Sequence, residues 1–140
     1  MTYWLIKSEP ETFSLEDFRK EQVTVWYGVR NYTARNNLKA MQLGDICLFY
    51  RSVTKPAVIA LSKVVREHYQ DPTTEEVAWV AVEVQLIEEF KSEVSLNTIK
   101  GIPELQHMAL LKLSRLSVQP VTEEEFALIC KMGRAGFSDS

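Results

Sequence analysis

A twelve-residue stretch, Trp26–Asn37, holds the side chains best suited to binding a ligand. It contains one indole, two phenols, two guanidiniums and three carboxamides, and no acid. Guanidiniums can fork onto phosphate or carboxylate oxygens, and aromatic rings offer faces for stacking. Carboxamides both donate and accept hydrogen bonds, which suits contact with the edge of a heterocyclic base. The composition of this stretch therefore indicates a binding surface.

Each of these groups also has an ordinary structural interpretation. Trp26 fits both a stacking platform and a core residue, whereas Trp4 and Trp79 lie in strand-like apolar runs and are expected in the core. Arg30 and Arg35 are five positions apart and do not share a helical face, but they can converge if Arg30 precedes a helix that carries Arg35. The alternative is that both arginines are solvated or form ion pairs with acids of the C-terminal half.

Three further segments place polar side chains where predicted strands begin or end. Lys7–Pro10 follows the first strand directly, and its carboxylate could accept hydrogen bonds from a base amino group. Phe49–Ser52 ends another strand, with Tyr50 and Ser52 expected on one side and the intervening residues on the other. Arg115–Val118 forms a polar entry to a third strand. Each segment is also compatible with an ordinary strand-to-turn junction.

The overall composition is typical of one globular domain. The chain has 140 residues, of which 46% are hydrophobic and 25% charged, and a chain of this size buries about 70% of its unfolded surface. No apolar run approaches the ~20 residues needed to span a bilayer, and the N-terminus does not resemble a secretory signal. Cys47 and Cys130 are expected to be buried and reduced, which predicts a cytoplasmic location, or a nuclear one in a eukaryote.

The sequence offers little for catalysis or metal binding. It contains no Gly-rich phosphate loop and no nucleophile elbow, and neither His68 nor His107 lies in a triad pattern. Neither histidine has a partner at metal-ligand spacing, so no metal and no other cofactor are expected. These observations predict a protein that is not an enzyme.

Charge is distributed unevenly along the chain. The formal net charge is −3, yet residues 26–66 hold seven basic residues and only one acid, Asp45. Residues 67–140 hold thirteen acids and six bases. Because the basic segment begins with Trp26–Asn37, it is consistent with an anion-binding face on an acidic protein. The alternative is that this segment forms no single patch in space.

The hydrophobic pattern predicts five or six strands and several short helices. Strands are expected at residues 3–7, 46–51, 57–66, 78–86 and 116–120, and the strand at 78–86 alternates, which predicts one buried face. Capping-box patterns at Ser14–Asp17 and Thr122–Glu125 predict helices that run to about residues 20 and 131. Helices are also expected at 33–41, 95–100 and 106–112. The irregular spacing favours an α+β fold with a small, bent sheet or barrel and helices at its rim.

Taken together, these segments resemble the EVE domain family, in particular its thymocyte nuclear protein branch. The motifs that carry the resemblance are Tyr3–Pro10, Trp26–Asn37, Gly44–Asp45, Phe49–Ser52, Tyr69–Pro72 and Arg115–Pro120. The resemblance implies one domain over residues 1–132, and the small, polar residues 133–140 are expected to form a flexible tail. It also implies a PUA-like mixed β-barrel of five or six strands with short helices around it, related to YTH domains. In one departure, only six residues separate Pro72 from Trp79, where the family carries a longer, tyrosine-bearing loop.

The resemblance further implies recognition of a modified nucleobase, with methylated or hydroxymethylated cytosine in DNA as the leading candidate. The base would be turned out of its stack into an aromatic-walled pocket. The residues implied in ligand binding are Lys7, Ser8, Glu9, Pro10, Trp26, Val29, Arg30, Asn31, Tyr32, Arg35, Asn36, Tyr50, Ser52, Arg115, Leu116, Ser117 and Val118. The alternative is a small heterocyclic or nucleotide-like ligand in the same pocket, which the low positive charge of the chain favours.

Overall fold

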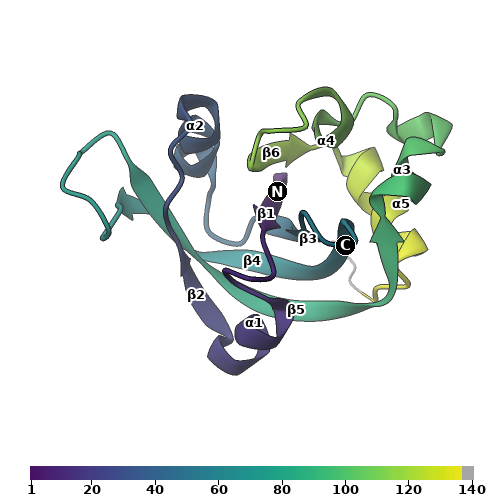
Figure 1. Cartoon of the computed structure of the whole chain (residues 1–140), viewed down its shortest axis with the longest axis horizontal. Coiled ribbons are helices and arrows are strands. Elements are labelled where there is room, and N and C mark those ends of the chain that lie inside the picture. The colour runs from purple at the N-terminus through teal and green to yellow at the C-terminus, as the bar shows by residue number, and fades with distance from the viewer. Residues whose placement is uncertain (137–140) are drawn as a thin grey trace.

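The computed structural model describes residues 1–136 and contains one mixed sheet flanked by short helices (Figure 1). The strands are β1 (Tyr3–Ser8), β2 (Val23–Trp26), β3 (Ile46–Arg51), β4 (Ala57–Gln70), β5 (Val80–Ser95) and β6 (Val118–Val121). The helices are α1 (Leu15–Glu21), α2 (Tyr32–Ala40), α3 (Leu96–Lys100), the 3₁₀ helix η1 (Pro103–Leu105), α4 (Ala109–Lys112) and α5 (Glu123–Met132). Half of the predicted tail, residues 137–140, lies outside the described residues.

The prediction of an α+β fold with a six-stranded mixed sheet is confirmed. The strand order is β2-β5-β4-β3-β1-β6, with β1 and β3 parallel and the other neighbours antiparallel. Over residues 1–136, however, this sheet is not closed into the expected barrel, because its edge strands β2 and β6 do not pair with each other. Helix α2 is bonded to β6 and to the residues before β5: Asn37 Nδ2 donates to Val118 O on β6 (2.7 Å), and Arg35 Nη1 donates to Ala78 O (2.8 Å).

Two helices begin where their capping residues predict. Ser14 Oγ accepts from the Asp17 amide (3.1 Å), and Asp17 Oδ2 accepts from the Ser14 amide (2.9 Å). Thr122 and Glu125 exchange the same two bonds, at 3.1 and 2.9 Å. These reciprocal bonds satisfy amides that have no acceptor inside the helix. Both capping-box predictions are therefore confirmed.

Three strands differ from the sequence prediction. Strand β2 was not expected, because its four residues lie between a charged helix and Gly28, yet it pairs with β5 from Val23 to Trp26. Strands β4 and β5 extend beyond their expected ends to Gln70 and Ser95. The extensions carry charged residues, so their composition does not indicate a strand. Backbone pairing between neighbouring strands, rather than composition, defines them.

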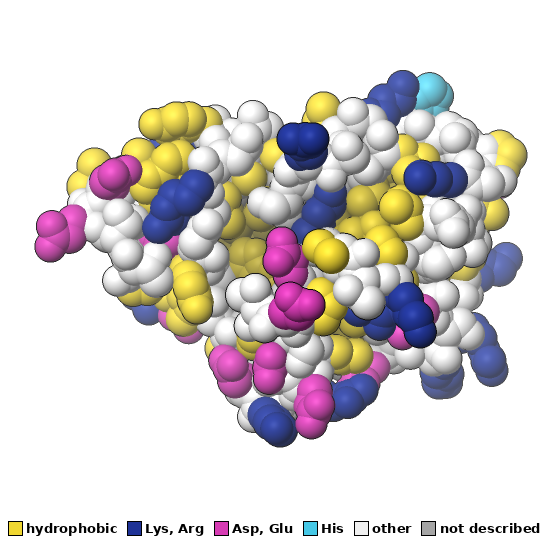
Figure 2. Space-filling view, in the orientation of Figure 1, with side chains coloured by type: hydrophobic (Ala, Val, Ile, Leu, Met, Phe, Trp, Pro, Cys, Tyr) yellow, Lys and Arg dark blue, Asp and Glu magenta, His cyan; other side chains and the backbone are white. Residues whose placement is uncertain are grey.

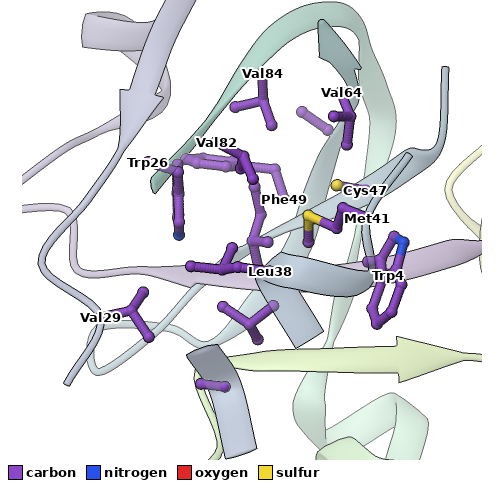
Figure 3. Packing of buried hydrophobic residues seen from close by; sticks show 14 of the residues in the cluster. Trp4, Trp26, Val29, Leu38, Met41, Cys47, Phe49, Val64, Val82 and Val84 are labelled. Carbon is purple, nitrogen blue, oxygen red and sulfur yellow. The ribbon is translucent and has the colours of Figure 1, made fainter. Parts of the chain in front are cut away.

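The sheet carries a hydrophobic core on each face. The first core contains Trp26 and Phe49, together with Phe18 of α1 and residues of α2 (Figure 3). The second core contains residues of β1, β3 and β4 packed against α3, α4 and α5, which Figure 1 shows gathered on one side of the molecule. The buried face predicted for β5 is confirmed, because its alternating residues all lie in the first core: Val80, Val82, Val84 and Leu86.

Cys47 and Cys130 are both buried, as predicted. Among the described residues, no group of three or more His, Cys, Asp or Glu side chains is arranged to hold a metal ion. Of the helices in residues 1–136, none combines the length and the apolar character needed to cross a bilayer.

Candidate functional site

A cavity of about 390 Å³, here called the central pocket, lies between the end of β2 and the segment that follows β1. Its lining includes residues from β2, at one edge of the sheet, and from β1 and the position before β6, near the other edge. Figure 2 shows a recess with a hydrophobic floor and charged side chains of both signs at its rim. The lining residues are Lys7, Ser8, Glu9, Thr12, Phe13, Thr24, Val25, Trp26, Tyr27, Gly28, Val29, Arg30 and Ser117.

Trp26 is at once a core residue and a wall of the central pocket. Its side chain is 9% exposed and belongs to the first core. Its ring makes edge-to-face contacts with Phe13 (6.2 Å between centroids, 89°) and with Phe49 (6.1 Å, 83°). Such contacts fix the orientation of an aromatic ring. The core interpretation of Trp26 is therefore confirmed, and the same packing holds the residue at the pocket, while its use as a stacking platform stays a prediction.

The wall formed by Gly28–Arg30 is held by the buried carboxylate of Asp71. One oxygen accepts from the Gly28 amide (2.8 Å) and from Arg30 Nη1 (2.9 Å). The other accepts from the amide (2.7 Å) and the hydroxyl (2.6 Å) of Thr73. Gly28 has a φ of 81°, which glycine adopts without strain. We call this arrangement the Asp71 latch.

The Asp71 latch is built to hold a charge. Burial by itself raises the pKa of Asp71, but the hydrogen bonds from Thr73, the Gly28 amide and Arg30 outweigh it and lower the pKa to about 2. The side chain of Asp71 is fully buried, whereas that of Arg30 is 40% exposed. Asp71 therefore stays ionised at neutral pH and orients the guanidinium at the pocket wall.

A stack of two aromatic rings with an arginine on each side lies beside this wall. Arg30 Cζ is 5.7 Å from the Trp79 ring, the Trp79 and Tyr32 rings are 4.9 Å apart, and Arg35 Cζ is 5.1 Å from the Tyr32 ring. Arg35 Nε also donates to Asn36 Oδ1 (2.9 Å). The short loop before Trp79 is closed by a bond from the Asp71 amide to Trp79 O (3.0 Å). The two arginines thus converge on one stack, but only Arg30 lines the pocket.

The opposite wall is held mainly by backbone hydrogen bonds. The Lys7 amide donates to Ser117 O (3.0 Å), which joins β1 to the start of β6. Ser8 Oγ donates to Phe13 O (2.5 Å), and the Phe13 amide donates to Glu9 O (2.9 Å). These bonds fold residues 8–13 into a tight turn that presents the Glu9 side chain and the Phe13 ring to the cavity.

Lys7 connects this wall to a second cavity. Its Nζ donates to Ser114 O (2.6 Å) and lies 5.8 Å from the Tyr50 ring. Burial lowers the pKa of Lys7 below its ordinary value. Ser114 lines a neighbouring cavity of about 360 Å³, together with Asn31, Thr33, Leu113, Arg115 and Leu116.

The structure brings together part of the set of site residues implied by the sequence. Those that line the central pocket are Lys7, Ser8, Glu9, Trp26, Val29, Arg30 and Ser117. Those that line other cavities are Pro10, Asn31, Arg115 and Leu116. Those outside all of these cavities are Tyr32, Arg35, Asn36, Tyr50, Ser52 and Val118.

The residues outside the cavities have structural contacts instead. The predicted alternation along β3 places Phe49 in the first core with Trp26, so Tyr50 faces the second core on the other side of the sheet. Ser52 supports the pocket from behind, since its amide donates to Ser8 O (2.9 Å). Val118 is fully buried in the first core.

Sequence reasoning did not single out two residues that shape the pocket. Asp71 lies within the Tyr69–Pro72 motif of the family. An acid directly before a proline in such a motif could have identified it as a residue of the site. Phe13 is the one large apolar residue in the polar segment 9–14, which also marks it. In both cases the role depends on partners that are distant in the sequence or on ring packing.

Much of the positive charge of residues 26–66 is neutralised in space. Three of its arginines form ion pairs with acids of the C-terminal half, namely Arg30 with Asp71 (2.9 Å), Arg51 with Glu93 (2.6 Å) and Arg66 with Glu83 (3.0 Å). The ion-pair alternative is therefore confirmed for Arg30, and for Arg35 it is not, because that side chain donates to a backbone carbonyl and a carboxamide.

Comparisons with known proteins agree with this architecture. Thymocyte nuclear protein 1 of Rattus norvegicus is 38% identical over 167 residues, which cover 95% of this chain and 74% of the relative. The crystal structure of human THYN1 protein in complex with 5-methylcytosine containing DNA is 34% identical, with a TM-score of 0.89 over 98% of this chain and 100% of that one. The YTH domain of Zygosaccharomyces rouxii MRB1 protein, solved with N6-methyladenosine RNA, shares the fold at 16% identity, with a TM-score of 0.57 over 99% and 90% of the two chains.

The family resemblance seen in the motifs is thus confirmed over nearly the whole chain. The family model for the EVE domain matches residues 2–132, which span all the elements from β1 to α5. The chain belongs to the EVE domain family.

Proposed function

We propose that this domain is a non-catalytic reader of a modified nucleobase, with methylated or hydroxymethylated cytosine in DNA as the candidate ligand. The observation that carries the proposal is the central pocket, where the packed ring of Trp26 meets polar groups from both halves of the sheet. The human relative solved with 5-methylcytosine containing DNA supports the choice of ligand, because it is 34% identical along its whole length.

The energetics of the pocket are adequate for this task. Taking a base out of its stack costs a few kcal/mol, and stacking on an aromatic side chain recovers about 1–3 kcal/mol. Hydrogen bonds to the base edge from Arg30, Glu9 or Ser117 supply the rest. Because Asp71 already neutralises Arg30, we assign this guanidinium to the edge of the base rather than to a phosphate.

The pocket is not expected to catalyse a reaction. Two of its side chains that carry nucleophilic groups donate hydrogen bonds to backbone carbonyls: Ser8 Oγ to Phe13 O, and Lys7 Nζ to Ser114 O. Neither side chain is hydrogen-bonded to a general base, which nucleophilic catalysis requires. We expect binding without turnover, in the cytoplasm or, in a eukaryotic cell, in the nucleus.

The test is a titration of matched oligonucleotides at low salt, each with one central cytosine that is unmodified, methylated or hydroxymethylated. The wild type should bind a modified form more tightly, and Trp26→Ala should lose about 1–3 kcal/mol of binding free energy. Tyr69→Ala is the control, since the Tyr69 ring packs against Arg66 at 3.8 Å and does not line the pocket. Equal affinity for all three oligonucleotides, unchanged by Trp26→Ala, would refute the proposal.

A small heterocyclic or nucleotide-like ligand is the second candidate. It is favoured by the ion pairs that neutralise Arg30, Arg51 and Arg66, because a duplex is usually held by several free cations. Salt separates the two candidates. Binding to DNA should weaken steeply with rising salt, with a slope of about −0.9 per phosphate contact on a plot of log K against log salt. A nearly flat dependence, with tight binding of the free modified nucleoside, would favour the small ligand.

A further inference from the structure

A third cavity, here called the rear cavity, adjoins the central pocket. It measures about 320 Å³ and is lined by Ser8, Pro10, Phe13, Ser14, Leu15, Glu16, Arg19, Phe49, Arg51, Ile59 and Glu93. Phe13 and Ser8 line both cavities. The rear cavity combines an apolar floor with hydroxyl and charged groups at its rim, so it could hold either an alkyl or a hydroxylated group.

The Phe13 ring, which is the larger of the two side chains that line both cavities, is here called the partition. Its ring lies 6.2 Å from Trp26, 5.5 Å from Phe18 and 6.4 Å from Phe49, so it packs against the first core. Its backbone is held on both sides, because its amide donates to Glu9 O and its carbonyl accepts from Ser8 Oγ. A ring with these contacts is a fixed wall rather than a loose surface side chain.

From this geometry, and resting on the reader function proposed above, we infer that Phe13 sets the upper size limit for the substituent on the bound base. A base stacked on Trp26 lies parallel to the indole and therefore perpendicular to the Phe13 ring, which makes 89° with the indole. A substituent on the edge of the base nearest to Phe13 then meets that ring. A methyl group fits in front of the ring, whereas a bulky substituent collides with it.

The inference predicts a gain of function when the partition is removed. Phe13→Ala joins the central pocket to the rear cavity, so a large substituent can pass into the space behind. The probes are oligonucleotides with one central cytosine that carries hydrogen, methyl, hydroxymethyl or a glucosylated hydroxymethyl group. We expect the wild type to prefer methyl to the glucosylated group, and Phe13→Ala to reduce that preference by about tenfold, the effect typical of a changed pocket volume.

Two further variants keep the test decisive. Leu15→Ala is the matched control, because Leu15 lines the rear cavity but not the central pocket, and its preference should equal that of the wild type. Phe13→Leu keeps a smaller partition and should reduce the preference by less than Phe13→Ala does. Thermal unfolding of each variant identifies any that does not fold. If Phe13→Ala does not fold, the preference of Phe13→Leu tests the inference in its place.

The outcomes distinguish this inference from the proposed function. If the wild type prefers methylated to unmodified cytosine but the folded Phe13 variants keep its size preference, the size limit is set elsewhere and the inference is wrong. An equal change in Leu15→Ala would overturn it too, since a general loosening would then explain the result. If the wild type shows no preference for any modified cytosine, the reader function itself fails, and this inference with it.

Discussion

The two walls of the central pocket are built by different physical means. The Gly28–Arg30 wall is held by a buried, ionised carboxylate that accepts four hydrogen bonds, two of them from the wall itself. In the other wall, the turn at residues 8–13 is held by neutral bonds among backbone groups and the Ser8 hydroxyl. Charge-assisted bonds are roughly twice as strong as neutral ones. The stability of the Gly28–Arg30 wall therefore depends on an ionised carboxylate and on pH, whereas that of the turn does not.

This difference matches the work proposed for each wall. An arginine that contacts a base must have a fixed orientation and must not bind other anions. The Asp71 latch orients Arg30 and also neutralises its charge. A wall that presents a serine, a glutamate and a phenylalanine ring needs only a rigid turn. Variants that change each wall separately test this difference in stability.

The largest effect is expected from Asp71→Asn. The new amide group places a donor against the donors of Gly28, Arg30 or Thr73, and Arg30 loses its counter-charge. Hydrogen bonds to a charged group contribute about 1.5–3 kcal/mol, so the free energy of unfolding in urea should fall by that amount.

The control for this variant is Glu93→Gln. It removes another arginine pair, but Glu93 is 56% exposed, and exposed pairs contribute about 0.2–1 kcal/mol. If both variants lost the same stability, the Asp71 latch would be no more important than a surface ion pair.

The second effect is a dependence of stability on pH. The native pKa of Asp71 is about 2, below the ordinary value of about 3.9 for an unfolded aspartate. A lowered native pKa adds stability above the unfolded pKa, so this contribution, on the order of 2 kcal/mol, is present at pH 7 and is lost as the pH falls from about 5 to 2.

The measurement is the difference in unfolding free energy between the wild type and Asp71→Asn across that range of pH. Subtracting the variant removes the contributions of other carboxyls with lowered pKa values, such as Glu89 and Glu93. The difference should shrink toward acid pH. A constant difference would mean that packing, and not charge, accounts for the effect of Asp71.

The smallest effect is expected from Ser8→Ala on the other wall. This variant removes one neutral hydrogen bond, from Ser8 Oγ to Phe13 O, and should cost about 1 kcal/mol of unfolding free energy. Because no ionised group takes part in that bond, the cost should be the same at pH 7 and at pH 4. A cost that varied with pH would contradict the proposed contrast between the walls.

Several features of the fold were readable in the sequence because they depend on neighbouring residues. The caps at Ser14 and Thr122 involve partners three positions away, so their patterns predict the helix starts correctly. The buried face of β5 follows from an alternation that the pleat of a strand imposes. The family motifs indicated the α+β class and the location of Trp26 and Lys7–Pro10 near one pocket.

Other features depend on partners far away along the chain. Strand β2 is too short to be recognised alone and is defined by pairing with β5, about sixty residues later. Tyr50 follows the alternation predicted for β3, but only the assembled sheet determines which of its faces carries the pocket. Over residues 1–136 the sheet is open, with β2 and β6 as its edges, and no local pattern encodes whether two strands so far apart in the sequence pair.

The chemical groups available to the pocket, and the local elements that carry them, can thus be read from the amino-acid sequence. Long-range packing determines which groups meet, that Arg30 is neutralised by Asp71, and that Phe13 lines two cavities. The difference lies in the range of the interactions. Caps and strand faces are set by hydrogen bonds and sterics within a few residues, whereas the pocket is assembled from segments around residues 7–13, 24–30, 71 and 117 that only the packed sheet brings together.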